Sequence, residues 1–428
     1  MKARETFDLL RRYESPNVTF IEKDESWPIV WERARGVHVW DSAGKKYLDL
    51  TAGFGVCAAG HANSRVIKAG QRQMARLLHA MGDVHPHARK GELARELSRI
   101  TFQRWSGQPG RTILCNSGFE AVEAALKTAL LATGKRGIVA FEGAYHGLGY
   151  GALNATHRAL FRRPFTSQLG GFGRFIRYPT DADEIPIVRR AVEKALSGAR
   201  IGAVLVEPVQ GRGGIRVPPR VFLPMLRELC DRAGALLVVD EIYTGFARTG
   251  RWFACEHSGA IPDLICLGKA LAGGFPISAC VGRAELIERA WPASKGEAIH
   301  TSTFLGHPVG CAMALAQIRE VEARRLDQRS AERGAYLLQL LGKVTNPDLI
   351  LEARGLGLMA GLELKTRQGQ PATIATFNCV KEMLRLGFIL LPEGEHGNVI
   401  GFTPPLIIAK AQLHATVNAL KLVLRNVA

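Results

Sequence analysis

From residue 111 to about residue 290, short apolar runs alternate with stretches of helical length. The apolar runs show almost no alternation with polar residues, as expected for strands buried on both faces. Helix-length stretches, including Glu120–Ala132, Glu184–Ser197 and Pro224–Ala233, separate most of them. This rhythm predicts an α/β domain whose mostly parallel sheet is sandwiched by helices. Its seven strands are expected at Arg111–Cys115, Gly137–Phe141, Gly173–Arg177, Ala203–Glu207, Leu236–Asp240, Leu264–Leu267 and Ile277–Val281.

The patterns on either side differ from this rhythm. Residues 1–35 suggest an arm made of a helix and an extended piece. Val37–Leu50 is typical of a hairpin with its turn at Asp41–Gly44, and Thr51–Gly60 is rich in glycine and alanine, which allows a close backbone approach. Further helices are expected at Ser64–Ala80, Lys90–Thr101, Pro308–Arg325, Ser330–Leu341, Ile374–Leu386 and Lys410–Val427, and further strands within Gly355–Leu364, Phe388–Leu391 and Val399–Phe402.

These patterns divide the chain into three parts. Residues 1–60 form the N-terminal arm and part of a small domain, residues 61–315 form the large domain, and residues 316–428 form the C-terminal small domain. The small domain is expected to be α+β, built from C-terminal and N-terminal segments. The 428 residues, 47% hydrophobic and 22% charged, suit a globular protein of about two domains.

The composition indicates the cellular compartment of the protein and the kinds of site to expect. No apolar run reaches the roughly 18 residues of a membrane span, and Met1–Glu14 lacks the apolar core of a secretory signal. The eight cysteines are scattered without a CxxC pair, which indicates reduced core residues of a cytoplasmic protein. His85 and His87 have no third ligand at a suitable spacing, so we expect no metal site.

The net charge of +17 raises the possibility of nucleic-acid binding. The basic residues are spread along the chain, and no zinc-finger or RNP-type motif accompanies them. A basic surface without a specific partner is therefore the favoured interpretation. Nucleic-acid binding is kept as one functional hypothesis. It predicts salt-dependent binding that persists when Lys269, a candidate catalytic residue discussed below, is replaced.

Chemistry-bearing residues follow the predicted strands, where ligands bind in such sheets. Lys269 follows Leu264–Leu267, and a buried ammonium is costly unless the amine condenses with an aldehyde and loses its charge. A solvated lysine in a glycine-rich turn is the ordinary alternative. Asp240 ends the fifth strand and needs a donor or cation, either a pyridinium N–H or a structural arginine.

Two further strand ends add to this set. Ser117 and Glu120 have capping-box spacing, and a helix N-terminus reached through a small flexible entry binds anions. An ordinary capped helix fits equally well. Tyr145, beside His146 and Gly147, either stacks on a planar ring or plugs the top of the sheet. A phosphate-binding helix start, a stacking aromatic, a buried Asp and an imine-capable Lys are together the parts that pyridoxal phosphate requires.

The chain resembles a class III (subgroup II, ornithine-type) aminotransferase of pyridoxal-phosphate (PLP) fold type I. The matching stretches come in the family order and cover nearly the whole chain. They are Asn116–Ala121, Tyr145–Gly147, Glu207–Gly211, Asp240–Gly245, Gly250, Leu267–Leu271 and Thr301–Gly306.

The resemblance implies a role for each matching residue. Lys269 corresponds to the Schiff-base lysine and Asp240 to the partner of the pyridine nitrogen. Ile242 and Tyr145 correspond to the residues on the two ring faces, with His146 beside the aromatic. Ser117, Gly118 and Phe119 correspond to the phosphate loop, and Thr303 to a threonine reaching the phosphate from a second subunit, which implies a homodimer with shared sites. Tyr243 replaces a frequent glutamine near the ring hydroxyl, and Glu207 is a possible structural member of the site.

The chain departs from this pattern where relatives bind carboxylates. Ornithine- and GABA-type members carry arginine at the position of Leu148, glutamate at that of Arg212 and arginine near that of Gly401. Arg212 is therefore either a carboxylate fork or the partner of a structural acid. Phe54 either lines the substrate mouth or packs in the core.

The sequence thus predicts a PLP-dependent aminotransferase that acts on an amine or amino acid and a 2-oxo acid. An amino-acid racemase or aminomutase on the same scaffold is the alternative, because both reactions need the same cofactor and proton removal. No nucleic-acid or membrane partner is expected.

Overall fold

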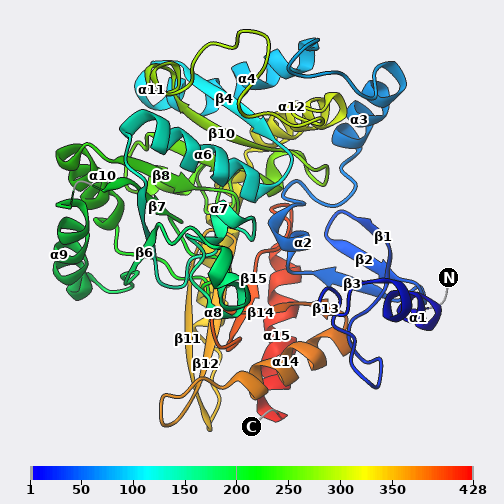
Figure 1. Ribbon diagram of the computed structural model, residues 1–428. Helices are drawn as coiled ribbons and strands as arrows, with labels where there is room; N and C mark the ends of the chain where they lie inside the picture. Colours follow the sequence, from blue (N-terminus) through cyan, green and yellow to red (C-terminus); the bar gives the residue numbers. More distant parts are fainter. Residues whose placement is uncertain (1–2, 199, 427–428) are drawn as a thin grey trace.

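A computed structural model describes residues 3–198 and 200–426 (Figure 1). Its centre is a seven-stranded sheet in the order β4-β10-β9-β8-β7-β5-β6. The strands are β4 (Gly110–Cys115), β5 (Gly137–Phe141), β6 (Gly173–Ile176), β7 (Ile201–Val206), β8 (Leu236–Asp240), β9 (Leu264–Leu267) and β10 (Ser278–Arg283). All neighbouring strands are parallel except β10, which is antiparallel to both β4 and β9. The predicted mostly parallel sheet of seven strands is confirmed.

Helices cover both faces of this sheet, because alternate side chains of each strand enter two different cores. On one face, Leu205 and Val238 pack with side chains of α6 (Gly118–Thr133) and α11 (Ala284–Ala290). On the other face, Val204 and Val239 pack with α4 (Ala88–Ile100), α9 (Ile185–Leu196), α10 (Phe222–Ala233) and α12 (Pro308–Ala323). The sandwich leaves the carboxyl ends of the parallel strands uncovered by these helices.

Further helices and turns lie between the N-terminal strands and η4. They are α2 (Ala52–Gly55), α3 (Ser64–Arg76), α5 (Phe102–Ser106), α7 (Tyr150–Leu153), α8 (Ala159–Arg162) and the 3₁₀ turns η1 (Arg163–Gln168), η2 (Ala182–Glu184), η3 (Ala254–His257) and η4 (Lys269–Leu271).

The small domain combines both ends of the chain. One sheet has the order β11-β12-β15-β14 and the other β1-β2-β3-β13, so the N-terminal strands join a strand near residue 388. Its elements are α1 (Ala3–Tyr13), β1 (Trp31–Arg35), β2 (His38–Asp41), β3 (Lys46–Asp49), α13 (Leu326–Leu341), β11 (Leu349–Leu356), β12 (Met359–Thr366), α14 (Thr373–Arg385), β13 (Phe388–Ile389), β14 (Leu391–Glu393), β15 (Val399–Phe402) and α15 (Lys410–Asn426). In Figure 1 the blue N-terminal strands and the red C-terminal helix lie beneath the large domain.

The structure has helices and strands in the regions where the sequence predicts them, but several begin or end at other residues. The helix expected at Ser64–Ala80 ends at Arg76, where Leu77 takes an extended conformation. The strand region expected within Gly355–Leu364 is a hairpin that begins at Leu349. Helix α12 packs on α3 and α4, whereas α13 packs on β11 and α15, so the chain changes partners at Arg324 and Arg325. Met1 and Val427, which bounded two expected segments, lie outside the described residues.

The structure bears on the predicted state of the cysteines and on the search for membrane-spanning helices. All eight thiols are free; seven are buried and Cys57 is half-buried. Across residues 3–198 and 200–426, no helix combines the length and the apolar character needed to cross a membrane.

Candidate active site

A cavity of about 370 Å³ opens at the carboxyl ends of the central strands. Residues from the ends of β5, β7 and β8, from the start of α6 and from the turn after β9 line it. They are Gly118, Phe119, Tyr145, His146, Gly147, Leu148, Glu207, Arg212, Asp240, Ile242, Tyr243 and Lys269. The topology therefore gathers residues that are up to about 150 positions apart in sequence, as the sheet architecture predicts.

Lys269 enters this cavity from a constrained turn. Its φ of 42° lies in the left-handed region, and its Nζ lies 3.5 Å from the centre of the Tyr243 ring. Burial lowers the pKa of Lys269 to about 8, although the negative charges of Asp240 and Glu207 oppose the shift. With this pKa a minor but substantial share of the amine, roughly a fifth, is neutral near pH 7.4, far more than for an ordinary lysine, which suits a nucleophile.

Asp240 ends β8 and is almost fully buried. Its Oδ1 accepts a hydrogen bond from the Ile242 N–H (3.0 Å), and its Oδ2 lies 2.7 Å from His146 Nδ1. His146 Nε2 is buried and makes no hydrogen bond to the described residues. The histidine thus holds the carboxylate from one side and leaves it oriented in the cavity.

The start of α6 is arranged as an anion site. Glu120 Oε2 accepts the N–H groups of Asn116 and Ser117, whereas Ser117 Oγ is buried without a hydrogen-bond partner among the described residues. A Cβ on Gly118 would lie 3.1 Å from Ile242 Cδ1, so only glycine lets this helix start pack so closely on the β8 end. The buried hydroxyl of Ser117 and the N–H groups of the first turn of α6 suit a phosphate.

Glu207 supports the cavity wall from the end of β7. Its Oε1 accepts the Tyr145 N–H (3.0 Å) and its Oε2 accepts the Gly211 N–H (3.1 Å). Burial raises its pKa to about 7, and the nearby charge of Asp240 raises it further, while His146 and the two backbone donors oppose the shift. Glu207 thereby fixes Tyr145 and the loop that carries Arg212.

Arg212 lines the cavity and has an acidic partner that the sequence did not reveal. Its Nε lies 3.7 Å from Oε2 of Glu393, a residue of β14 that is only 5% exposed. Burial raises the pKa of Glu393 to about 6, against the positive charges of Arg212 and Lys269. Of the two possibilities raised by the sequence, the structure shows a contact with an acid, and the carboxylate fork stays a prediction.

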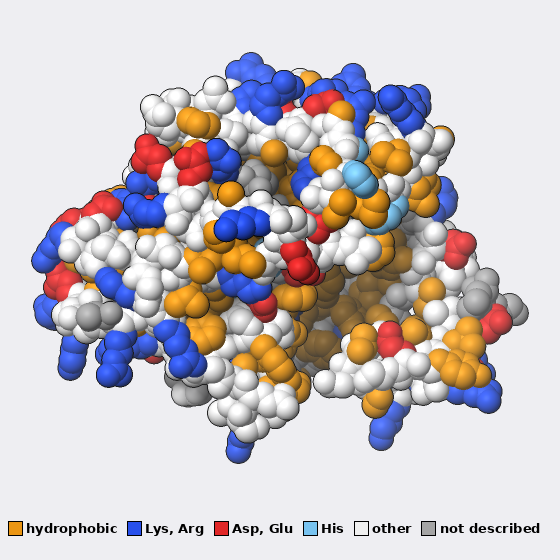
Figure 2. All heavy atoms as spheres, turned by 45° about the horizontal axis from the view of Figure 1, so that its top comes forward, with side chains coloured by type: hydrophobic (Ala, Val, Ile, Leu, Met, Phe, Trp, Pro, Cys, Tyr) orange, Lys and Arg blue, Asp and Glu red, His pale blue; other side chains and the backbone are white. Residues whose placement is uncertain are grey.

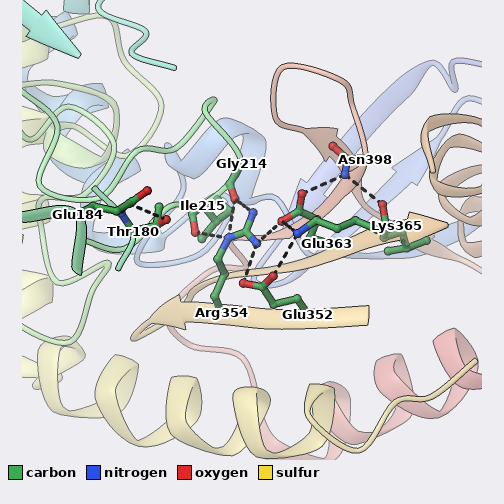
Figure 3. Close-up of polar contacts among 10 residues, drawn as sticks. Thr180, Glu184, Gly214, Ile215, Glu352, Arg354, Glu363, Lys365 and Asn398 are labelled. Carbon is green, nitrogen blue, oxygen red and sulfur yellow. Dashed lines mark hydrogen bonds and ion pairs between the residues drawn. The ribbon is translucent and has the colours of Figure 1, made fainter. Parts of the chain in front are cut away.

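The backbone around Arg212 is tied to the small domain (Figure 3). Arg354 of β11 donates from Nη2 to the Gly214 carbonyl (2.7 Å) and from Nε to the Ile215 carbonyl (3.1 Å). Its Nη1 donates to Glu363 (2.6 Å), which Asn398 also contacts. The loop is thus fixed at its base, whereas the Arg212 side chain is one-third exposed.

Three expected site residues lie differently from the rest. Tyr243 lines the cavity, but its hydroxyl pairs with Thr403 Oγ1 (3.1 Å), and Gly55 and Gly211 pack against its ring. Phe54 is 54% exposed and outside the cavity lining, so the expectation that it packs in the core is wrong. Thr303 is exposed and does not line the cavity of its own chain.

The residues present fit pyridoxal phosphate. The orphaned Ser117 Oγ at a helix N-terminus suits the phosphate, the buried Asp240 carboxylate suits a protonated ring nitrogen, and Ile242 and Tyr145 supply apolar and aromatic walls. Lys269 supplies an amine whose lowered pKa suits bonding to an aldehyde. By contrast, no group of three potential metal ligands occurs in the described residues, His85 and His87 included.

Comparisons with known proteins agree with this fit. The model of the class-III aminotransferase family matches residues 20–424. The acetylornithine aminotransferase of Methanosarcina mazei is 38% identical over 92% of this chain and 91% of its own length. The putrescine aminotransferase of Pectobacterium atrosepticum is 35% identical over 99% of this chain and 89% of its own. A PLP-bound amine transaminase from an uncultivated Pseudomonas species superimposes with a TM-score of 0.88 at 29% identity, covering 97% and 99% of the two chains.

Proposed function

The chain belongs to the class III aminotransferases, and we propose that Lys269 and Asp240 carry out its reaction within the cavity that they share. The chain is a PLP-dependent enzyme of fold type I, as its relatives are, and it transfers an amino group from an amine or amino acid to a 2-oxo acid. The observation that carries the assignment of roles is the convergence of Lys269, Asp240 and the α6 N-terminus on one cavity.

Each side chain in the cavity has a separate role in the proposed reaction. The cofactor, when bound, supplies an electron-accepting ring that stabilises negative charge on the substrate carbon. Asp240 keeps the ring nitrogen protonated, and His146 holds Asp240 in place. Lys269 Nζ, once free, takes the proton from the substrate carbon and returns it elsewhere, a role that suits an amine with a pKa of about 8. Ser117 and the N–H groups of α6 hold the phosphate, and Ile242 and Tyr145 hold the ring.

A covalent-trapping experiment tests this assignment. The cofactor-loaded protein should be coloured, and borohydride should fix the cofactor on Lys269, as peptide mass spectrometry would show. Lys269→Ala should give no trapped peptide and no turnover with any donor. A colourless loaded protein, or label on another lysine, would overturn the roles of Lys269 and Asp240.

The racemase or aminomutase alternative receives no support from the comparisons, whose relatives carry aminotransferase names. Incubation with one amino acid and no oxo acid separates the two reactions. Transfer predicts a single conversion of the cofactor that stops at one equivalent. Continuous isomerisation would contradict it.

For the acceptor, we propose that Arg212 binds the carboxylate of the 2-oxo acid. Its side chain lines the cavity, and its one ion pair to the described residues is made from Nε and not from either Nη group. Both groups are therefore available for a two-point contact with a carboxylate. Arg212→Ala should raise the KM for the oxo acid, and an unchanged KM would remove this role.

We further propose a homodimer in which Thr303 reaches the phosphate of the partner subunit. The segment carrying Thr303 packs on the segment of residues 77–87, through Thr301 and Asp83 (2.7 Å) and through His87 and the Gly306 carbonyl (2.7 Å). Large apolar side chains are exposed on both segments, namely Leu77, Leu78, Met81, Val84, Ile299 and Phe304. Figure 2 shows a deep hollow with hydrophobic side chains on its floor, a surface that suits a second copy.

Subunit mixing tests this arrangement. Lys269→Ala and Thr303→Ala proteins are mixed after partial denaturation and refolding. Shared sites predict that the hybrid regains one intact site, since one chain supplies Lys269 and the other Thr303. Activity of the mixture that only averages the two variants would contradict sharing.

The eight free thiols favour a reducing compartment, and we propose that the enzyme is cytoplasmic. Fractionation of cells that express the tagged protein would test this. We propose no nucleic-acid partner: a mobility-shift titration should show no binding at physiological salt.

A further inference from the structure

Glu393 is a nearly buried carboxylate beside the cavity residue Arg212. Within the described residues, its one ion pair is the 3.7 Å contact with Arg212. Arg212 Nε is itself buried without a hydrogen bond. A buried carboxylate with incomplete hydrogen bonding costs free energy that a ligand with N–H donors recovers.

The fold holds Glu393 in this position. Glu393 faces Val399 across the β14–β15 pair, and a Cβ added to Gly401 of β15 would lie 2.9 Å from Glu393 Cγ. The absence of a side chain at Gly401 therefore makes room for the glutamate. The next residue, Gly394, donates its N–H to the Arg212 carbonyl (3.1 Å), which keeps the two charged residues in fixed register.

The electrostatic position of Glu393 links it to the reacting amine. The charges of Glu393 and Lys269 shift one another's pKa, so the carboxylate acts electrostatically on the amine. With a pKa of about 6, Glu393 is ionised at neutral pH. Arg212 lines the cavity, Glu393 does not, and the two side chains approach to 3.7 Å.

We propose that Glu393 binds the second, distal ammonium group of a diamine donor, which displaces the Arg212 side chain from it. This inference rests on the aminotransferase function proposed above and names the donor class for that site. Among residues 3–198 and 200–426, the Arg212 side chain is held by the 3.7 Å ion pair and by a contact 5.7 Å from the centre of the Tyr145 ring, and it reaches solvent. Its displacement breaks no hydrogen bond of the guanidinium to the described residues.

The same pair serves the acceptor without rearrangement. The Nε edge of Arg212 faces Glu393, which leaves both Nη groups for the carboxylate of the oxo acid. The distal ammonium of a diamine therefore pairs with the carboxylate of Glu393, and the carboxylate of an oxo acid pairs with the guanidinium of Arg212. Each charged substrate group thus contacts a side chain of opposite charge.

The experiment compares two matched series of donors on the cofactor-loaded enzyme. α,ω-Diamines and n-alkylamines of equal chain length are tested in the first half-reaction, followed by the visible absorbance of the cofactor. The quantity measured is the ratio of kcat/KM for a diamine to that for the monoamine. Glu393→Gln keeps the shape and removes the charge, and it should lower this ratio at least tenfold, which corresponds to about 1.4 kcal/mol.

Two further variants make the result decisive. Glu395→Gln changes an exposed glutamate two residues away and should keep the wild-type ratio. Arg212→Gln should raise the ratio, because it removes the group that competes for Glu393, and this result stands even if Glu393→Gln fails to fold. An unchanged ratio in Glu393→Gln, or a lower ratio in Arg212→Gln, would overturn the inference while both donor series still convert the cofactor. If neither series converts it in the wild type, the proposed function fails as well.

Discussion

Lys269 allows a quantitative test of the electrostatics of the cavity. In the cofactor-free protein Lys269 is half-buried in the cavity wall, and this burial lowers its pKa from the ordinary 10.5 to about 8. Lys269→Met keeps a similar length and removes the charge. We expect the methionine variant of the cofactor-free protein to be more stable than the wild type near neutral pH.

The magnitude follows from the pKa values. They differ by about 2.5, and each unit corresponds to about 1.4 kcal/mol, so the cost of holding the ammonium is at most about 3.5 kcal/mol. The ammonium lies 3.5 Å from the Tyr243 ring centre, a favourable contact worth about 1 kcal/mol that the variant loses. The net gain expected for Lys269→Met is therefore at most about 2.5 kcal/mol.

The lowered pKa of Lys269 also determines how the stability difference between the two proteins changes with pH. The folded state binds this proton less tightly than the unfolded chain, so the unfolded chain carries more protons between pH 8 and 10.5. The stability of the wild type relative to the variant therefore rises with pH across this window, and the full cost is present below it. Thermal unfolding of both proteins across this range should show a gap that is largest near neutral pH and closes towards pH 10.5. A gap that does not change with pH would refute the reasoning, since every other titrating group is common to both proteins.

Other substitutions test the packing and the site. Gly334→Ala should destabilise the fold by several kcal/mol in a thermal melt, because its Cβ would lie 2.0 Å from the Gly357 carbonyl oxygen. Gly91→Ala, on a helix face with nothing within 4 Å, should instead stabilise the fold by about 1 kcal/mol. Asp240→Asn should lower kcat/KM in the first half-reaction about a hundredfold or more, because a buried cation loses its partner. Gly118→Ala should weaken cofactor retention during dialysis, because a Cβ there presses on Ile242.

The sheet and the strand-end residues were predictable because their signals are local. A buried strand shows as an apolar run, and its next residue lies at the carboxyl edge whatever the strand order. The antiparallel direction of β10 also has a local signal in the length of the connection before it. Only ten residues separate Leu267 from Ser278, too few for the helical crossover that a parallel strand needs.

Glu393 was missed because nothing near it in sequence marks it. It lies more than 120 residues from Lys269, within a short strand, and its importance comes from burial beside Arg212. The open space at Gly401 was a partial signal, since a missing side chain invites a neighbour to fill it. Which neighbour does so depends on strand pairing, which periodicity does not determine. Phe54 failed for a similar reason, since an aromatic in a glycine-rich stretch does not show whether the backbone turns it outward.

Strand pairing also constrains how this molecule is made on the ribosome. In the central sheet the first strand, β4, pairs only with the last strand, β10. Strand β4 therefore stays unpaired until about residue 283 has left the ribosome. The N-terminal hairpin waits longer, because Leu48 pairs with Phe388. A nascent chain therefore exposes unpaired strands for most of its synthesis, and contacts so distant in sequence fold slowly. Stalled or truncated products of this gene are expected to need chaperones far more than the finished enzyme does.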